Sequence, residues 1–341
     1  MQRLILHFVG WCCFALLAQA ESLAADDPGP NRADEPVRKE FSLAAATDFL
    51  DAASADWWQS RQCFTCHTNY SYLLVRPGLK KPLPAELNVR QQLEDLVEKR
   101  WVEKGPRWDA EVVMSGAILA QHDAATTGNL HPTTRKALDR MWTVQRADGG
   151  FNWLKCNWPP MESDDHYGAT VALIGVGAAP DQYAGTSQAA AGLSRLKEYL
   201  AANPPPTIHH KLMVLWAASY HPGMVSEEQR KAWLDEASQL QRPDGGWNVA
   251  SLGNWKRDDD SPQDRSTSDG YATGLVTYVL RRSGTSADDA RIARAIAWLK
   301  ANQRESGRWF TRSLFKDNKH YLTHAGTAMA LLALTSCGVT E

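Results

Sequence analysis

The sequence predicts an all-α protein, a closed (α/α)6 toroid in which six outer helices surround six inner ones. A Gln-Arg-x-x-Gly-x-aromatic segment recurs at Gln145, Gln241 and Gln303, each time after an amphipathic helical pattern. Each copy is followed by a stretch that is small or apolar on every face, which predicts a helix buried on every side. An open stack would leave the end helices uncovered, so closure is expected, with an open helical solenoid as the alternative.

The pairs follow one another along the chain. The expected outer helices cover 42–58, 88–101, the segment before Gln145, 188–203, the segment before Gln241, and 293–302. The expected inner helices cover 67–75, 109–121, 164–177, 211–220, 268–280 and 320–334. The fourth pair is degenerate, because the Pro-rich segment 204–210 replaces its loop. A polar insertion, 251–265, lengthens the fifth.

The N-terminus predicts export. Residues 1–20 have a basic start, an apolar run and a small-x-small end, as in a secretory signal peptide. Residues 21–41 are charged and Pro-rich and predict a flexible leader, so that the toroid spans 42–341. We therefore expect a periplasmic or secreted protein without a transmembrane segment after signal removal. The net charge of −2 gives no reason to expect nucleic-acid binding.

The repeated loops resemble those of a known superfamily. Residues 294–309, RAIAWLKANQRESGRW, resemble the QW repeats of squalene/oxidosqualene cyclases and protein prenyltransferase β-subunits. The resemblance implies an α/α barrel whose central cavity takes a hydrophobic or isoprenoid-like small molecule. It also implies that the loop Gln ties the start of the inner helix and that the Trp stacks on the outer one.

The chemistry of that superfamily matches less well. Cyclases of this type use an Asp-x-Asp-Asp motif, whereas here Arg257 precedes Asp258-Asp259-Asp260 in a loop insertion. Prenyltransferases bind zinc through Asp, Cys and His. Asp269 and His324 resemble two of these ligands, but Tyr271 stands where the Cys is needed, so zinc is not expected.

A second motif, Cys63-Phe64-Thr65-Cys66-His67, has the Cys-x-x-Cys-His spacing of a c-type haem site. In such a site two thiols bind the haem and the adjacent His becomes the proximal iron ligand, here His67. A redox dithiol, half a zinc site and a structural disulfide are the alternatives.

The starts of the inner helices collect further candidates at one rim of the predicted barrel. The distal haem ligand is expected among His166, His210, His324, Met114, Met161 and Met213. Asp165, His166 and Asp269 are candidate catalytic groups.

These observations favour a toroid that holds haem and a hydrophobic molecule and has a redox or electron-transfer role, with a redox protein as possible partner. A haem-free terpenoid cyclase or isomerase is the first alternative. A non-catalytic binding toroid is the second.

Overall fold

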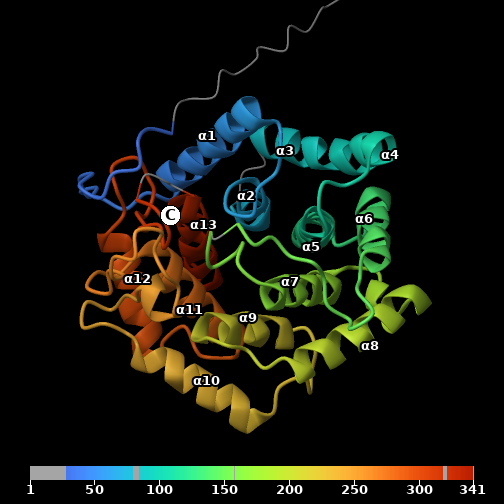
Figure 1. Ribbon diagram of the computed structural model, residues 1–341. Coiled ribbons are helices and arrows are strands. Elements are labelled where there is room, and N and C mark those ends of the chain that lie inside the picture. Colours follow the sequence, from blue (N-terminus) through green and yellow to red (C-terminus); the bar gives the residue numbers. More distant parts are fainter. Residues whose placement is uncertain (1–27, 80–83, 157, 318–320, 341) are drawn as a thin grey trace, which may run out of the picture.

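The computed structural model describes residues 28–79, 84–156, 158–317 and 321–340 (Figure 1). In this part of the chain the regular elements are helices, and β-structure is limited to two isolated bridges. The predicted signal peptide, 1–20, lies outside the described residues.

Six inner helices form a closed ring. They are α2 (Asn69–Val75), α5 (Asp109–Thr126), α7 (Asp165–Ala178), α9 (Ile208–Ala218), α11 (Gly270–Arg282) and α13 (Tyr321–Ser336). Each packs against the next, and α13 packs against α2, so the ring has no open end (Figure 1). This arrangement confirms the predicted (α/α)6 toroid.

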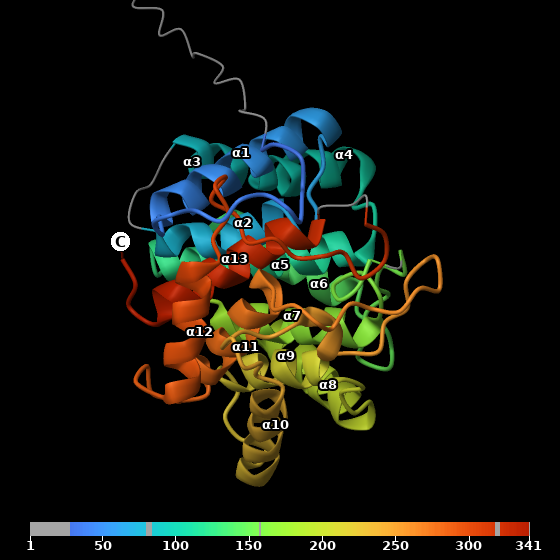
Figure 2. The same ribbon diagram turned by 90° about the vertical axis from the view of Figure 1, so that its left-hand side faces the viewer.

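The outer helices surround this ring, with α1 and α10 on opposite sides of it (Figure 2). They are α1 (Leu43–Arg61), α3 (Pro84–Asp95), α4 (Trp101–Lys104), α6 (Pro132–Thr143), α8 (Ser187–Ala202), α10 (Glu227–Gln239) and α12 (Ala290–Ala301). The π-helical η2 (Leu96–Arg100) joins α3 to α4, which makes them one outer element. Short 3-10 turns are η1 (Arg76–Gly78), η3 (Tyr183–Gly185) and η4 (Val249–Ser251).

The Gln of each repeated loop clamps the outer helix of the following pair. Gln145 Nε2 donates a hydrogen bond to the Gly192 carbonyl in α8, at 2.9 Å, and Gln241 Nε2 donates to the Arg291 carbonyl in α12, at 2.8 Å. The Gln side chain was expected to hold the start of the inner helix. This expectation is wrong, because the hydrogen bonds described for Gln145 and Gln241 reach the next outer helix instead.

The third clamp closes the ring. Gln303 Nε2 donates to the Ser42 carbonyl, and the Ser42 amide donates to Gln303 Oε1, both at 2.8 Å. Ser42 is the N-cap of α1, the first outer helix. The loop of the sixth pair thus holds the outer helix of the first pair through the same kind of Gln contact that links successive pairs elsewhere in the ring.

Close backbone approach explains the glycine in each loop. Gly307 has φ +96°, and a Cβ built on it would lie 2.1 Å from the Ala45 carbonyl oxygen. A Cβ built on Gly149 would lie equally close to the Arg195 carbonyl oxygen of α8. A side chain at either position would push the next outer helix away.

The loop aromatics fill the space behind the clamp. Trp247 and Trp309 are fully buried, and their Nε1 atoms donate to the carbonyls of Ala237 and Leu299, each in the preceding outer helix, at 2.8 Å. Phe151 takes this place in the first loop and is also fully buried. The expected contact between the loop aromatic and the outer helix is present at both tryptophans.

Candidate functional site

The starts of the inner helices meet at one rim, as expected. Thr68 Oγ1, at the start of α2, lies 3.0 Å from His324 Nδ1 in the first turn of α13. His209 Nε2, in α9, lies 3.0 Å from the Tyr271 hydroxyl in α11. These contacts bring residues far apart in sequence into one polar layer above the apolar interior.

Cys66 and His67 line a pocket of about 280 Å³ at this rim, which we call the aromatic pocket. Its apolar wall contains Trp57, Phe64, Trp108, Leu154 and Trp158. The polar part of the lining also includes Thr65, Tyr70, Glu111, Cys156 and Glu162. The volume lies just below the range of about 300–1,000 Å³ that is typical of small-molecule sites.

His67 is held by its neighbours in this pocket. Its ring nitrogens lie 3.0 and 3.2 Å from Thr65 Oγ1, and its Nε2 lies 3.4 Å from Glu162 Oε1. Trp57 meets the imidazole edge-on, with ring centroids 5.7 Å apart. A buried carboxylate beside an imidazole fixes the orientation of the ring.

The two motif cysteines differ in environment. Cys66 is buried and Cys63 is half-buried, and both are free thiols. Burial, reinforced by the negative charge of Glu162, raises the pKa of the Cys66 thiol well above its usual value. The raised pKa favours the neutral thiol at Cys66, and the redox dithiol, like the haem site, stays a prediction.

The expected distal ligands lie outside the aromatic pocket. His166 and His210 pack against each other, with ring centroids 5.1 Å apart, and His324 contacts Thr68. Met114, Met161 and Met213 line the central cavity instead. None of these six residues is among those that line the aromatic pocket.

Among the polar pocket residues that sequence reasoning missed, Glu162 and Cys156 come from a distant part of the chain. They lie in the loop between α6 and α7, about 90 positions from the Cys-x-x-Cys-His motif. The one sequence signal that could have placed Glu162 and Cys156 at the rim is that they precede an inner helix, α7.

A second cluster joins Asp164 to three histidines. Asp164 caps α7 by accepting from the Tyr167 amide, and both of its carboxylate oxygens lie 3.0 Å from His210 Nε2. The pKa of Asp164 is lowered despite partial burial, because His210, the Tyr167 amide and a serine hydroxyl favour the charged carboxylate. Burial lowers the pKa of His166 to about 4 and that of His209 to about 3, with a smaller contribution from nearby His210.

The expected catalytic acids have structural contacts of their own. Asp165 accepts from Arg146 Nη1 at 2.6 Å and from the Trp153 amide at 3.2 Å, which holds the loop before α7. Asp269 is the N-cap of α11, and burial raises its pKa to about 7 although two close backbone amides favour the charged form. Neither acid lines the central cavity, and their catalytic role stays a prediction.

The central cavity is apolar and small. Tyr167, Trp216, Tyr271 and Met329 line it together with the three methionines named above. Its volume is about 30 Å³, which is on the scale of one or two water molecules. Binding of an isoprenoid chain there stays a prediction and requires the lining side chains to move.

Among the described residues, no group of three or more His, Cys, Asp or Glu side chains is arranged to hold a metal ion. In the same part of the chain, no helix is both long enough and apolar enough to cross a bilayer.

Comparisons with known proteins bear on the fold. No protein-family model and no curated protein matches the chain. Among solved structures, a protein from Actinoplanes matches with a TM-score of 0.50 and 14% identity, over 86% of this chain and 99% of its own. A polysaccharide lyase matches with a TM-score of 0.53 and 11% identity, over 86% and 96%.

A longer structure is also similar. The ent-copalyl diphosphate synthase from Streptomyces platensis matches with a TM-score of 0.49 and 17% identity over 79% of this chain. The match covers 50% of that chain, so this protein spans about half the length of the synthase. At these identities the comparisons concern architecture, and the chain is an all-helical α/α toroid of a kind found among solved structures.

Proposed function

We propose that the protein carries a c-type haem and works as an exported redox protein. Cys63 and Cys66 would bind the haem covalently, and His67 would be the proximal iron ligand. The observation that supports this most is that Cys66 and His67 line the same aromatic pocket. Bound there, the haem would supply one-electron transfer.

The residues of the pocket fit such a group. Trp57, Trp108 and Trp158 offer broad apolar surfaces to a flat ring. Thr65 Oγ1, 3.2 Å from His67 Nδ1, would hold the imidazole from behind if Nε2 bound the iron, and Glu162, 3.4 Å from Nε2, would then have to move aside. A pocket of about 280 Å³ would hold only part of a haem, with Cys66 and His67 as the residues that attach it there.

A pyridine haemochrome spectrum tests this proposal. The chain is exported from a host that carries the c-type maturation system, and the spectrum is recorded after denaturation. A covalent haem signal that disappears in Cys63→Ala with Cys66→Ala, and that persists in the matched control Cys337→Ala, is expected. A folded, colourless wild-type protein from that host would refute it.

A second candidate is a haem-free enzyme of the cyclase or isomerase type, acting on a hydrophobic molecule. The contact that favours it is the Asp164–His210 pair at the starts of α7 and α9. Met161 and Tyr167, on either side of Asp164 in sequence, and Met213 line the apolar central cavity. Because the lowered pKa of Asp164 keeps it ionised, the pair would suit removal of a proton from a bound hydrophobic molecule.

Product analysis separates the two candidates. The colourless protein would be incubated with squalene and with geranylgeranyl diphosphate, and the extracts analysed by gas chromatography and mass spectrometry. Conversion that is lost in Asp164→Asn and kept in Asp258→Asn, a change in an exposed loop, supports the second candidate. No conversion of either compound counts against it and favours the non-catalytic binding toroid.

A further inference from the structure

We propose that a second pocket at the rim binds a neutral saccharide. This polar pocket has a volume of about 650 Å³ and lies between the loop that precedes α11 and the loop that precedes α13. It shares no lining residue with the aromatic pocket, so the proposal does not depend on haem. Its volume is well within the range of small-molecule sites.

The lining combines hydrogen-bonding side chains with aromatic rings. Amide side chains come from Asn31, Asn248, Gln263 and Asn302, and rings from Trp298 and Phe310. The side-chain nitrogens of Asn248, Gln263 and Asn302 already donate to backbone carbonyls, so the amide oxygens are the groups left to accept from sugar hydroxyls. The C–H faces of a sugar ring are apolar and pack on aromatic side chains.

The charges of the pocket disfavour anionic ligands. Four aspartates outnumber two arginines among its lining residues: Asp244, Asp264, Asp269 and Asp317 against Arg304 and Arg312. Arg312 is also engaged, since its Nε lies 2.7 Å from Asp317 Oδ1. A phosphate or a uronate would meet a net negative wall, whereas a neutral polyol would not.

The acidic side chains are held in place before any ligand arrives. Asp244 accepts from Trp298 Nε1 at 3.1 Å and from Ser268 Oγ at 2.8 Å. Asp264 accepts from Ser266 Oγ at 2.6 Å. Fixed polar groups lose little conformational entropy on binding, which favours recognition of a weakly interacting ligand such as a sugar.

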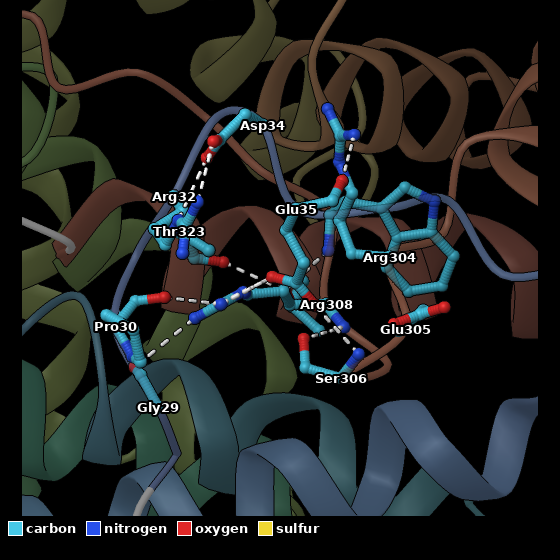
Figure 3. Close-up of polar contacts among 12 residues, drawn as sticks. Gly29, Pro30, Arg32, Asp34, Glu35, Arg304, Glu305, Ser306, Arg308 and Thr323 are labelled. Atoms are coloured by element: carbon cyan, nitrogen blue, oxygen red, sulfur yellow. Dashed lines mark hydrogen bonds and ion pairs between the residues drawn. The ribbon is translucent and has the colours of Figure 1, made fainter.

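The leader completes the pocket. Asn31 and Ala33 line it, and the segment that contains them is fastened to the last repeated loop (Figure 3). Glu35 Oε2 accepts from Arg308 Nε at 2.6 Å, and Glu35 Oε1 accepts from the Ser306 amide at 2.8 Å. The leader was expected to be flexible, and its described part is bound to the toroid through these contacts.

The anchor of the leader is buried. Arg308 is 4% exposed, and it also donates to the Pro30 carbonyl, one residue before Asn31. Val37 forms a β-bridge with Arg304, and the Arg304 guanidinium donates to the Glu35 carbonyl at 2.6 Å. The wall that carries Asn31 therefore has a defined position, as a binding wall requires.

The wall also has unsatisfied hydrogen-bonding groups. Among the described residues, Asn31 Oδ1 and Arg304 Nε are buried polar atoms without a hydrogen-bond partner. Both residues line the polar pocket. Leaving such groups unpaired costs free energy, which a bound hydroxyl next to them would offset after a small side-chain movement.

Calorimetric titration of the full exported chain tests the proposal. The probes are cellohexaose, xylohexaose, mannohexaose and maltohexaose, with hexagalacturonate and hexalysine as charged comparisons. At least one neutral probe is expected to bind, and Asn31→Ala is expected to weaken it by about fivefold, the effect of one hydrogen bond. The matched control Asn129→Ala, in an exposed loop on another part of the toroid, is expected to bind as wild type does.

A second variant tests the role of the leader. Glu35→Gln removes the charge that pairs with Arg308, so binding of the neutral probe should weaken while the circular dichroism of the toroid stays helical. Three results would overturn the proposal: no neutral probe binds, a charged probe binds in preference, or Asn31→Ala and Glu35→Gln both bind as wild type does.

Discussion

Acid is expected to destabilise the toroid through two histidines at the rim. The pKa values of His166, about 4, and of His209, about 3, compare with about 6.5 in an unfolded chain. Both imidazoles are therefore neutral in the folded protein at pH 7 and at pH 5. The unfolded chain binds protons over this interval, so the free energy of unfolding falls as the pH falls.

The magnitude follows from proton linkage. For one histidine with these pKa values, lowering the pH from 7 to 5 removes about 2 kcal/mol of the free energy of unfolding. The two together remove about 4 kcal/mol if they act independently. This is a large share of the stability of a typical domain.

His209→Phe isolates one of the two contributions. The imidazole lies between Tyr167 and Tyr271, with interplanar angles of 24° and 20°, so a phenyl ring has the shape to replace it. The variant loses the bond to the Tyr271 hydroxyl and should be less stable at pH 7. Its further loss between pH 7 and pH 5 should be smaller than that of wild type by about 2 kcal/mol.

Urea unfolding followed by far-UV circular dichroism at both pH values measures this difference, provided that the slope with denaturant is unchanged. Tyr167→Phe disturbs the same ring stack without removing a histidine, so it should keep the wild-type dependence on pH. If His209→Phe loses as much stability on acidification as wild type does, the reasoning is refuted.

Three further predictions concern the repeated loops, each measured by thermal unfolding. Gly307→Ala should destabilise strongly, because its Cβ would meet the Ala45 carbonyl at 2.1 Å, whereas Gly338→Ala, at φ +78° in open space, should cost only about 1–2 kcal/mol. Trp309→Ala should cost about 3–5 kcal/mol, since the side chain is fully buried. Gln303→Ala should cost about 1–3 kcal/mol, because it leaves backbone groups at the ring closure unpaired. An unchanged melting temperature in Gly307→Ala, Trp309→Ala or Gln303→Ala would contradict the contact assigned to that residue.

The helix pairs could be predicted because their signals are local. The alternation of amphipathic and all-apolar segments marked even the degenerate fourth pair, where the Pro-rich segment 204–210 replaces the loop. Helical periodicity and loop glycines are local signals, because each determines the structure of the few residues around it. Closure followed from the need to cover the end helices.

The partners of the loop glutamines could not be predicted from the same signals. Gln145 bonds to a carbonyl 47 positions later, and a backbone carbonyl leaves no mark in the sequence. The docking of the leader depends likewise on Arg308, a buried arginine 273 positions from Glu35. Charge and proline content favoured disorder there, whereas several long-range contacts to Arg304, Ser306 and Arg308 hold the leader in place.

The candidate site was predicted in outline and missed in detail. The rim location of Cys66, His67 and His166 followed from their place at the starts of inner helices, whereas Asp164 was not singled out. The contact between His67 and Glu162 depends on how the loop before α7 folds back across the rim. Asp165 looked catalytic because acids of this kind suit proton transfer, but Arg146, 19 positions earlier, engages it in the loop.

The clamp between Gln303 and Ser42 also bears on how the chain acquires its structure. These residues are 261 positions apart, so the first helix pair cannot gain its second neighbour until nearly the whole chain has been synthesised. Until then, the apolar surface of α2 that α13 will cover stays exposed. The last inner helix synthesised so far is likewise exposed on the side where the next helix will pack. Contacts of such long range form slowly and leave apolar surface open to aggregation in the meantime. We therefore expect the ring to close only once α13 has been synthesised, and a nascent chain that stops short of α13 to require a chaperone.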